Sequence, residues 1–358
     1  MGGLLYREDM DEVRRRLTIW WNGGDIGRPA LQISYPLQAP REEIPELAQP
    51  SGWATAYSTK DFVYRLNYEL CRGLRTGYLA EAAPNTSVCL GPNTLALYLG
   101  CRGVEQPGTV WFEPCLHTHA LDAFPSEQGN FYWDFTRRLA AAELREGRGK
   151  FLIQFPDLIE GLDTLAALHG TQCLLTDLLD RPKWVQACLR RITDRYFYYY
   201  DILYDLIRDE VGGSVFWAWA PGRMVKLQCD FSAMMSPQIF GEFMVPVLTE
   251  MTERISYSMY HWDGPGALCH HDHLLSIPGL KMLQWTPGAG NEPVWHEKWW
   301  PLYHKTVEAG KKVFIGVDTL DTLRRIKREF GTRMKQFLIG IGVNSLQEGE
   351  EMIKVAEI

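Results

Sequence analysis

The chain has 358 residues, of which 46% are hydrophobic and 23% charged, a composition typical of folded globular proteins and not of disordered or fibrous ones. Lys and Arg total 37 and Asp and Glu total 44, which gives a formal net charge of -7 without a long block of either sign. Nothing in this charge pattern would attract a phosphate backbone, so we expect no nucleic-acid partner.

Targeting and redox signals are absent from the sequence. Acidic residues and arginines interrupt the first 21 residues, and no stretch of about 18 apolar residues occurs, so we expect neither a signal peptide nor a membrane partner. The eight cysteines are scattered without a CxxC pair, which favours reduced thiols. These features predict a cytoplasmic location.

Short apolar or β-branched segments alternate with longer amphipathic ones, which predicts βα units and a parallel sheet. Strands are expected at 30–35, 87–90, 151–155, 214–219, 256–261, 281–285, 312–317 and 336–341. Helices are expected at 60–81, 131–147, 182–211, 237–255, 295–309, 320–330 and 346–356. Because eight is the strand number of a (β/α)8 barrel, we predict the α/β class and one TIM-barrel domain over residues 1–358, with N-terminal helical additions.

The expected fifth strand ends in YHWDGPG, which contains the strongest candidate for chemistry. His261 and Asp263 are two residues apart, so both side chains project to the same side of an extended chain. At the carboxyl end of a barrel strand such a pair can hold a metal or act as acid and base. The alternative is a turn in which Asp263 accepts backbone N–H groups while His261 packs in the core.

Other strand ends add polar groups to this face of the expected barrel. Asp157, Asp230, Gln284 and Asp318 follow or lie on four further strands, and Cys229 precedes Asp230. Each aspartate can instead cap a helix, the role we favour for Asp318. We predict that Asp230 is catalytic together with the histidine–aspartate pair, and that Asp157 and Gln284 contact the substrate.

Four tryptophans also gather at expected strand ends: Trp217, Trp219, Trp262 and Trp285. An aromatic-walled cavity suits a flat aromatic substrate or a methylated ammonium group held by cation–π attraction. We therefore place them in the substrate pocket, although tryptophans in a barrel more often pack in the core. No GxxxxGK[ST], GxSxG or HExxH motif is present, and no GxGxxG follows a strand, so the common nucleotide, hydrolase and zincin signatures are missing.

Four segments, 91–103, 155–185, 227–248 and 260–290, together resemble the uroporphyrinogen decarboxylase-like superfamily. Its barrels include porphyrinogen decarboxylases and corrinoid-linked, cobalamin-dependent methyltransferases. The resemblance covers nearly the whole chain and implies a (β/α)8 barrel that forms a homodimer.

In the zinc methyltransferases of this superfamily, a His-x-Cys after the fifth strand and a Cys after the eighth bind Zn2+ and activate a thiol. This chain keeps the histidine as His261 but has Asp263 in place of the first cysteine and Val343 where the second is expected. The resemblance therefore implies a harder site for zinc or another divalent metal, made by His261, Asp263 and a group such as Asp318, Cys229 or water.

Three functions follow from these expectations. The leading one is a methyltransferase that moves a methyl group between a small methylated compound and a corrinoid carried by a partner protein. The second is a uroporphyrinogen decarboxylase, but residues 33–38 and 89–92 lack the arginines and the carboxylate that this family uses to hold its substrate. The third is a non-catalytic barrel that binds a small ligand or a corrinoid protein.

Overall fold

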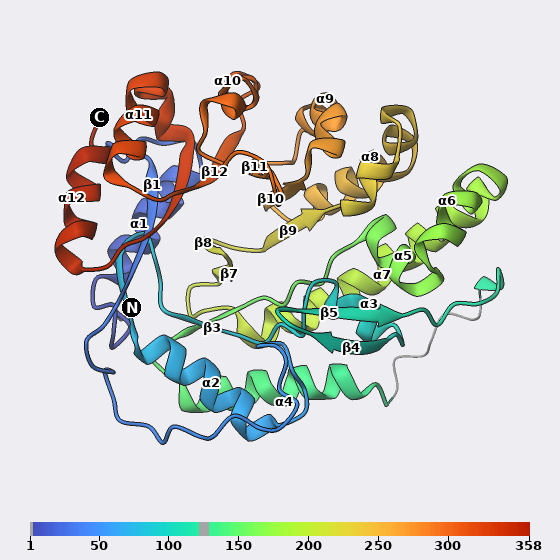
Figure 1. Ribbon diagram of the computed structural model, residues 1–358, viewed down its shortest axis with the longest axis horizontal. Coiled ribbons are helices and arrows are strands. Elements are labelled where there is room, and N and C mark those ends of the chain that lie inside the picture. Colours follow the sequence, from blue (N-terminus) through green and yellow to red (C-terminus); the bar gives the residue numbers. More distant parts are fainter. Residues whose placement is uncertain (1–2, 122–128) are drawn as a thin grey trace.

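The computed structural model describes residues 3–121 and 129–358 and contains two main sheets (Figure 1). Within these residues the larger sheet has seven strands in the order β2-β1-β13-β12-β11-β10-β9. Their bounds are β1 (Ala30–Pro36), β2 (Thr76–Ala80), β9 (Met224–Gln228), β10 (Tyr257–Asp263), β11 (Met282–Thr286), β12 (Lys312–Val317) and β13 (Phe337–Gly342). All neighbours run parallel except β2, which is antiparallel to β1.

The smaller sheet has the order β3-β6-β7-β8, and its first three strands are parallel. Its bounds are β3 (Asn85–Ser87), β6 (Leu152–Gln154), β7 (Ser214–Phe216) and β8 (Ala218–Ala220), and a separate hairpin is formed by β4 (Arg102–Gln106) and β5 (Thr109–Glu113). The α/β class with parallel strands is confirmed. A closed barrel is not shown, because no ladder of hydrogen bonds joins the two sheets within the described ranges.

Helices cover the outside of both sheets, and α8 to α12 follow the outer side of the larger one (Figure 1). Their bounds are α1 (Met10–Trp21), α2 (Phe62–Leu74), α3 (Thr94–Tyr98), α4 (Phe131–Glu146), α5 (Gly161–His169), α6 (Thr171–Asp180), α7 (Pro182–Ile207), α8 (Pro237–Arg254), α9 (His271–Ser276), α10 (Trp300–Glu308), α11 (Leu320–Phe330) and α12 (Leu346–Ala356). In the part of the chain that the structure describes, none of these helices is both long enough and apolar enough to cross a bilayer.

Most predicted elements are confirmed within a few residues, but the predicted helix over 60–81 is wrong beyond Leu74. From Thr76 the chain forms β2, which pairs with β1. Gly77 lies under the ring of Tyr35, where a Cβ atom would be only 2.2 Å from the ring carbon Cζ. Close approach of the two strands, which a helical pattern does not reveal, decides the conformation here. The helix predicted at 295–309 also begins later, at Trp300.

The predicted strand over 214–219 is wrong as well. The chain reverses at Trp217, whose φ of 55° lies in the left-handed region, so β7 and β8 form a tight antiparallel pair. The strand that continues the larger sheet is β9, which sequence reasoning did not predict. It pairs in parallel with β10 and brings residues 224–228 to the edge where the site forms.

A buried carboxylate joins α1 to the first two strands. Both nitrogens of the Arg28 fork donate to Glu81, at 2.7 and 2.8 Å, and Arg16 Nε donates to the same carboxylate at 2.7 Å. The Leu31 backbone N–H completes the set at 2.8 Å. Burial alone would raise the pKa of Glu81, but these donors hold it below its ordinary value.

We expect Glu81→Ala to lower the free energy of unfolding by about 3–5 kcal/mol, because it leaves the buried Arg28 guanidinium without its carboxylate partner and removes one of the two carboxylates that pair with Arg16. Denaturant unfolding of the variant measures this loss. Glu12→Ala, which removes the exposed partner of Arg15 and Arg16, is the control and should cost at most about 1 kcal/mol. Equal losses in the two variants would contradict the proposed anchoring role.

A second buried carboxyl makes stability depend on pH. Glu143 on α4 is 2% exposed, and burial raises its pKa to about 8, although the Thr86 hydroxyl donates to it at 2.6 Å. Since the folded state keeps this proton while the unfolded chain releases it near its ordinary value of 4.5, stability falls as pH rises from about 4.5 to 8.

Glu143→Gln removes this titration. Because one pKa unit corresponds to about 1.4 kcal/mol, the variant should gain up to a few kcal/mol over the wild type between pH 5 and pH 8. Denaturant unfolding across this range tests the prediction. A stability difference that stays constant with pH would show that Glu143 ionises normally.

Candidate active site

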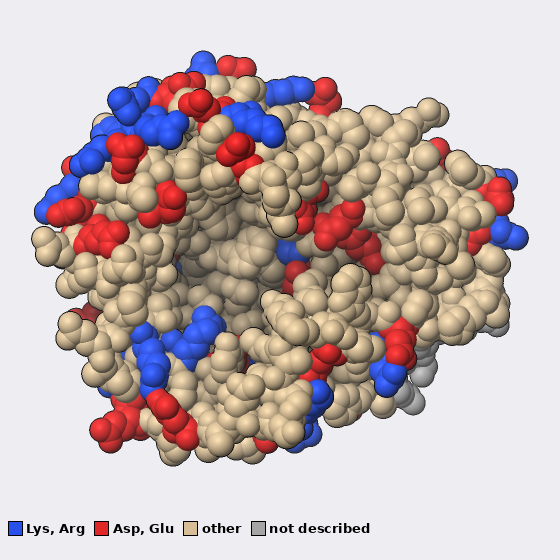
Figure 2. Space-filling view, in the orientation of Figure 1, with Lys and Arg blue, Asp and Glu red and all other residues tan. Residues whose placement is uncertain are grey.

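The face at which the parallel strands end is hollowed at its centre, and acidic side chains gather on the wall of the hollow (Figure 2). Strand register places three polar residues side by side on this wall. Gln228 of β9 lies opposite His261 of β10, which in turn lies opposite Gln284 of β11. Side chains alternate along each strand, so the same face of β10 also carries Asp263.

The His261 imidazole has a fixed proton arrangement. Gln284 Nε2 donates to the Trp285 carbonyl at 3.1 Å and to the Thr286 hydroxyl at 2.9 Å, so its amide oxygen faces His261. That oxygen can only accept, so His261 Nδ1 carries the hydrogen and donates it. In the neutral ring the lone pair is therefore on Nε2, 3.9 Å from Asp263 Oδ2.

Asp230 completes a group of three candidate ligands. One ligand atom from each of Asp230, His261 and Asp263 lies within 4.8 Å of the other two. This spacing brings one imidazole nitrogen and two carboxylates close enough to share a divalent cation or a proton. The structure thus brings together the three residues that the sequence suggested as catalytic.

The loop that presents Asp230 is held from below by the start of α5. Asp163 accepts the backbone N–H groups of Asp230 and Phe231, both at 2.8 Å. Glu160 accepts the N–H of Gln228 at 3.0 Å. Glu160 is buried and Asp163 is half-buried, and reduced solvation raises the pKa of each. Sequence reasoning missed this support because it did not predict α5.

The surroundings shift the pKa values of Asp230 and His261 in opposite directions. Reduced solvation raises the pKa of Asp230 to about 7, and the nearby carboxylates of Asp163 and Asp263 add to the shift. Burial lowers the pKa of His261, and the positive charge of Lys226 acts in the same direction. A neutral imidazole with a free lone pair is therefore favoured at neutral pH.

Lys226 is a site residue that sequence reasoning missed. Its side chain is 1% exposed and forms an ion pair with Asp157 at 2.6 Å, and its ammonium group lies 6.0 Å from the centre of the Trp217 ring. The Trp217 ring in turn contacts the His261 ring edge-on, with 5.7 Å between centroids. Lys226 and Gln228 are two residues apart on β9, so their side chains lie on the same, inward face of the strand. This could be read from the sequence only if β9 had been predicted.

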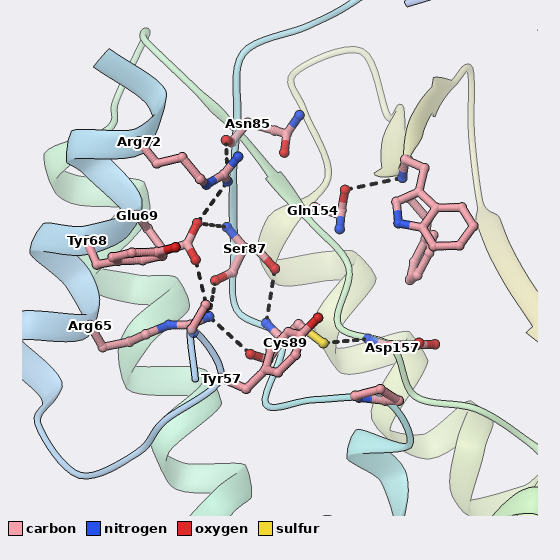
Figure 3. Close-up of a pocket in the computed structure, with 14 residues that line it drawn as sticks. Tyr57, Arg65, Tyr68, Glu69, Arg72, Asn85, Ser87, Cys89, Gln154 and Asp157 are labelled. Carbon is pink, nitrogen blue, oxygen red and sulfur yellow. Dashed lines mark hydrogen bonds and ion pairs between the residues drawn. The ribbon is translucent and has the colours of Figure 1, made fainter. Parts of the chain in front are cut away.

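A cavity of about 280 Å3 lies beside the group formed by Asp230, His261 and Asp263 (Figure 3). Trp217, which contacts His261, and Asp157 both line it. One wall is α2, from which Arg65, Glu69 and Arg72 reach the cavity. Glu69 pairs with both arginines, at 3.4 Å to Arg65 and 2.9 Å to Arg72. Arg65 also donates through Nη2 to the carbonyls of Ser87 and Cys89, at 2.8 and 3.0 Å, and its Nε and Nη1 atoms are buried without a hydrogen-bond partner.

Three of the four tryptophans that we placed in the substrate pocket lie elsewhere. Trp219 is buried in β8 and donates to Asp209 at 2.8 Å, because the reversal after β7 turns it away from the strand ends. Trp262 and Trp285 are also buried and pack against each other on the opposite side of β10 and β11 from the cavity. Alternation along the strand places them there, since His261 and Gln284 face inward.

Cys229 and Asp318 do not join the group of candidate ligands. Cys229 is 3% exposed, and burial raises its pKa well above the ordinary value, which disfavours the thiolate that binds metals. Asp318 accepts the Thr322 hydroxyl at 2.8 Å at the start of α11. Both residues follow strands of the larger sheet, but the Cys229 thiol is buried and the Asp318 carboxylate is hydrogen-bonded at the start of a helix.

No known protein-family model matches the chain, and no curated protein matches its sequence. Among solved structures, the chain is similar to a methyltransferase from Methanosarcina mazei. The match covers 96% of this chain and 98% of that one, with a TM-score of 0.59 and 11% identical residues. At this identity the similarity shows a shared fold.

Proposed function

We propose that this protein is a corrinoid-linked methyltransferase whose reaction centre is formed by Asp230, His261 and Asp263. The observation that carries the proposal is the convergence of these three groups at the strand ends, with the His261 lone pair kept free by Gln284. The structural neighbour, which is itself a methyltransferase, supports the reaction class. We further propose that the two sheets form the arcs of an interrupted (β/α)8 barrel in one domain.

The donor set fits a divalent metal. One imidazole and two carboxylates suit zinc or a similar first-row ion, and the hydrogen bond from His261 Nδ1 to Gln284 is the outer-shell contact that metal-binding histidines usually make. When bound, such an ion would act as a Lewis acid toward the heteroatom that carries the methyl group. Without it, the neutral His261 and the partly protonated Asp230 remain a base and an acid within reach of one another.

The cavity favours a small substrate. Its volume of about 280 Å3 is at the low end of small-molecule sites. Trp217, which is 37% exposed, offers an aromatic face beside the reaction centre, suited to a methylated ammonium or an aryl group. Arg72, an exposed side chain on the wall of the same cavity, can donate to a polar or anionic end of the same molecule.

The charge of this region argues against a decarboxylase acting on a tetrapyrrole with many carboxylates. The basic side chains Arg65, Arg72 and Lys226 already face Glu69 and Asp157 at ion-pair distance. Little positive charge is left for eight carboxylates, which need many charge-assisted hydrogen bonds.

Metal content tests the proposed reaction centre. We expect His261→Ala and Asp263→Ala each to contain one equivalent less of divalent metal than the wild-type protein, measured by elemental analysis after growth with zinc. Gln284→Leu should weaken metal affinity by about 10- to 100-fold, because the histidine loses its orienting acceptor. His296→Ala, which changes a half-buried histidine that is not among the three candidate ligands, is the control. Unchanged metal content in the first two variants would exclude them as ligands.

Methyl transfer is tested by following the loss of cob(I)alamin absorption with a panel of methylamines, methoxyarenes and methyl thiols. The transferred methyl leaves its heteroatom, which keeps the bonding electron pair, and bonds to cobalt. We expect one donor class to react, and Trp217→Ala to raise KM about 10-fold while Trp217→Phe restores most of the affinity. No reaction with any donor, in a protein that retains its metal, would contradict methyl transfer.

A further inference from the structure

A second cluster of potential ligands lies away from the cavity, where the segment after β5 packs against α5 and α6. It consists of His119 in that segment, His169 at the end of α5 and Asp177 on α6, whose ligand atoms all lie within 4.8 Å of one another. His169 and Asp177 are almost fully buried, whereas the side chain of His119 is 42% exposed. None of these residues contributes to the proposed reaction centre.

Hydrogen bonds around His169 determine where its lone pair points. Its Nδ1 lies 2.8 Å from the carbonyl oxygen of Leu116, which can only accept, so Nδ1 carries a hydrogen. The lone pair of the neutral ring is then on Nε2, 2.9 Å from the carboxylate oxygen Oδ2 of Asp177. Two acceptors cannot approach this closely unless a proton or a metal ion lies between them.

The same carboxylate oxygen receives a third group. His119 Nε2 lies 2.8 Å from Asp177 Oδ2, whereas the other oxygen, Oδ1, accepts from Arg181 at 2.8 Å. The imidazoles of His119 and His169 thus converge on one oxygen, while the Leu116 carbonyl holds the other nitrogen of His169 and Arg181 holds the other oxygen of Asp177. For His169 and Asp177 these are the outer-shell contacts that metal ligands usually make.

The surroundings suit a cation with one open position. The ring of Trp184 packs against both imidazoles, with centroids 4.7 Å from His119 and 4.9 Å from His169, and covers one side. Zinc–nitrogen and zinc–oxygen bonds of about 2.0–2.2 Å in a tetrahedron place ligand atoms about 3.3 Å apart. The two nitrogen–oxygen separations, 2.8 and 2.9 Å, need to open by only a few tenths of an ångström, and the exposed His119 side chain is free to adjust its own position.

We propose that His119, His169 and Asp177 form a second divalent-metal site, suited to zinc, with water as the fourth ligand. The ion would tie the segment after β5 to α5 and α6. The site would have three protein ligands and a partly exposed fourth position. It shares no residue with the reaction centre, so it does not depend on the proposed methyl transfer.

The test uses full-length protein carrying His261→Ala, which removes the reaction centre from the measurement. After removal of metal with a chelator, equilibrium dialysis against zinc chloride should give one bound equivalent. Adding His119→Ala should weaken this binding at least 10-fold, while His117→Ala, a change at an exposed neighbouring histidine, should leave it unchanged. Circular dichroism confirms that each variant is folded.

Cobalt(II) gives a second readout. Its visible absorption bands in the His261→Ala protein should be those of a four-coordinate site and should be lost with His119→Ala. If zinc binding in this background is absent, or is the same with and without His119, the cluster is a hydrogen-bonded one that shares protons and the proposal is wrong. If instead the His119-dependent zinc is found but His261→Ala and Asp263→Ala do not change the metal content, the proposed function is contradicted and the second site is not.

Discussion

The parallel register of β9, β10 and β11 is the constraint on which the rest of the site depends. Because neighbouring parallel strands end at one edge, Gln228, His261 and Gln284 lie in a row although they come from three separate strands. A shift of one residue in β10 would exchange His261 for Trp262 and fill the cavity wall with an indole. The packing of Trp262 and Trp285 behind the sheet thus fixes the polar face in front.

The polar groups around the hollow restrain one another electrostatically. The half-buried Asp163 holds the backbone of the Asp230 loop, the buried Glu160 holds the end of β9, and Lys226 is a buried cation paired with Asp157. Such groups are costly to desolvate, so each is retained with hydrogen-bond or charge partners. The result is a rigid wall on which a neutral histidine lies beside carboxylates, the arrangement that acid–base and metal chemistry both require.

Much of the fold was predictable from hydrophobic pattern and turn residues. The last third of the chain repeats strand and helix regularly, and β10 to β13 and α11 and α12 occur where they were expected. Prediction was wrong where tertiary contacts override local preference. The helix over 60–81 is broken at the packing of Gly77 against Tyr35, and the strand over 214–219 is broken at the left-handed Trp217.

By itself the sequence determined which residues are present at the strand ends, and so identified Asp230, His261 and Asp263 as one group. Two-residue spacing and strand alternation are local properties, which is why they can be read without a structure. Only the tertiary structure decided that Gln284 fixes the His261 proton, that Lys226 faces Asp157, and that His119, His169 and Asp177 meet. These contacts join segments far apart in the chain, and their geometry depends on how whole elements pack.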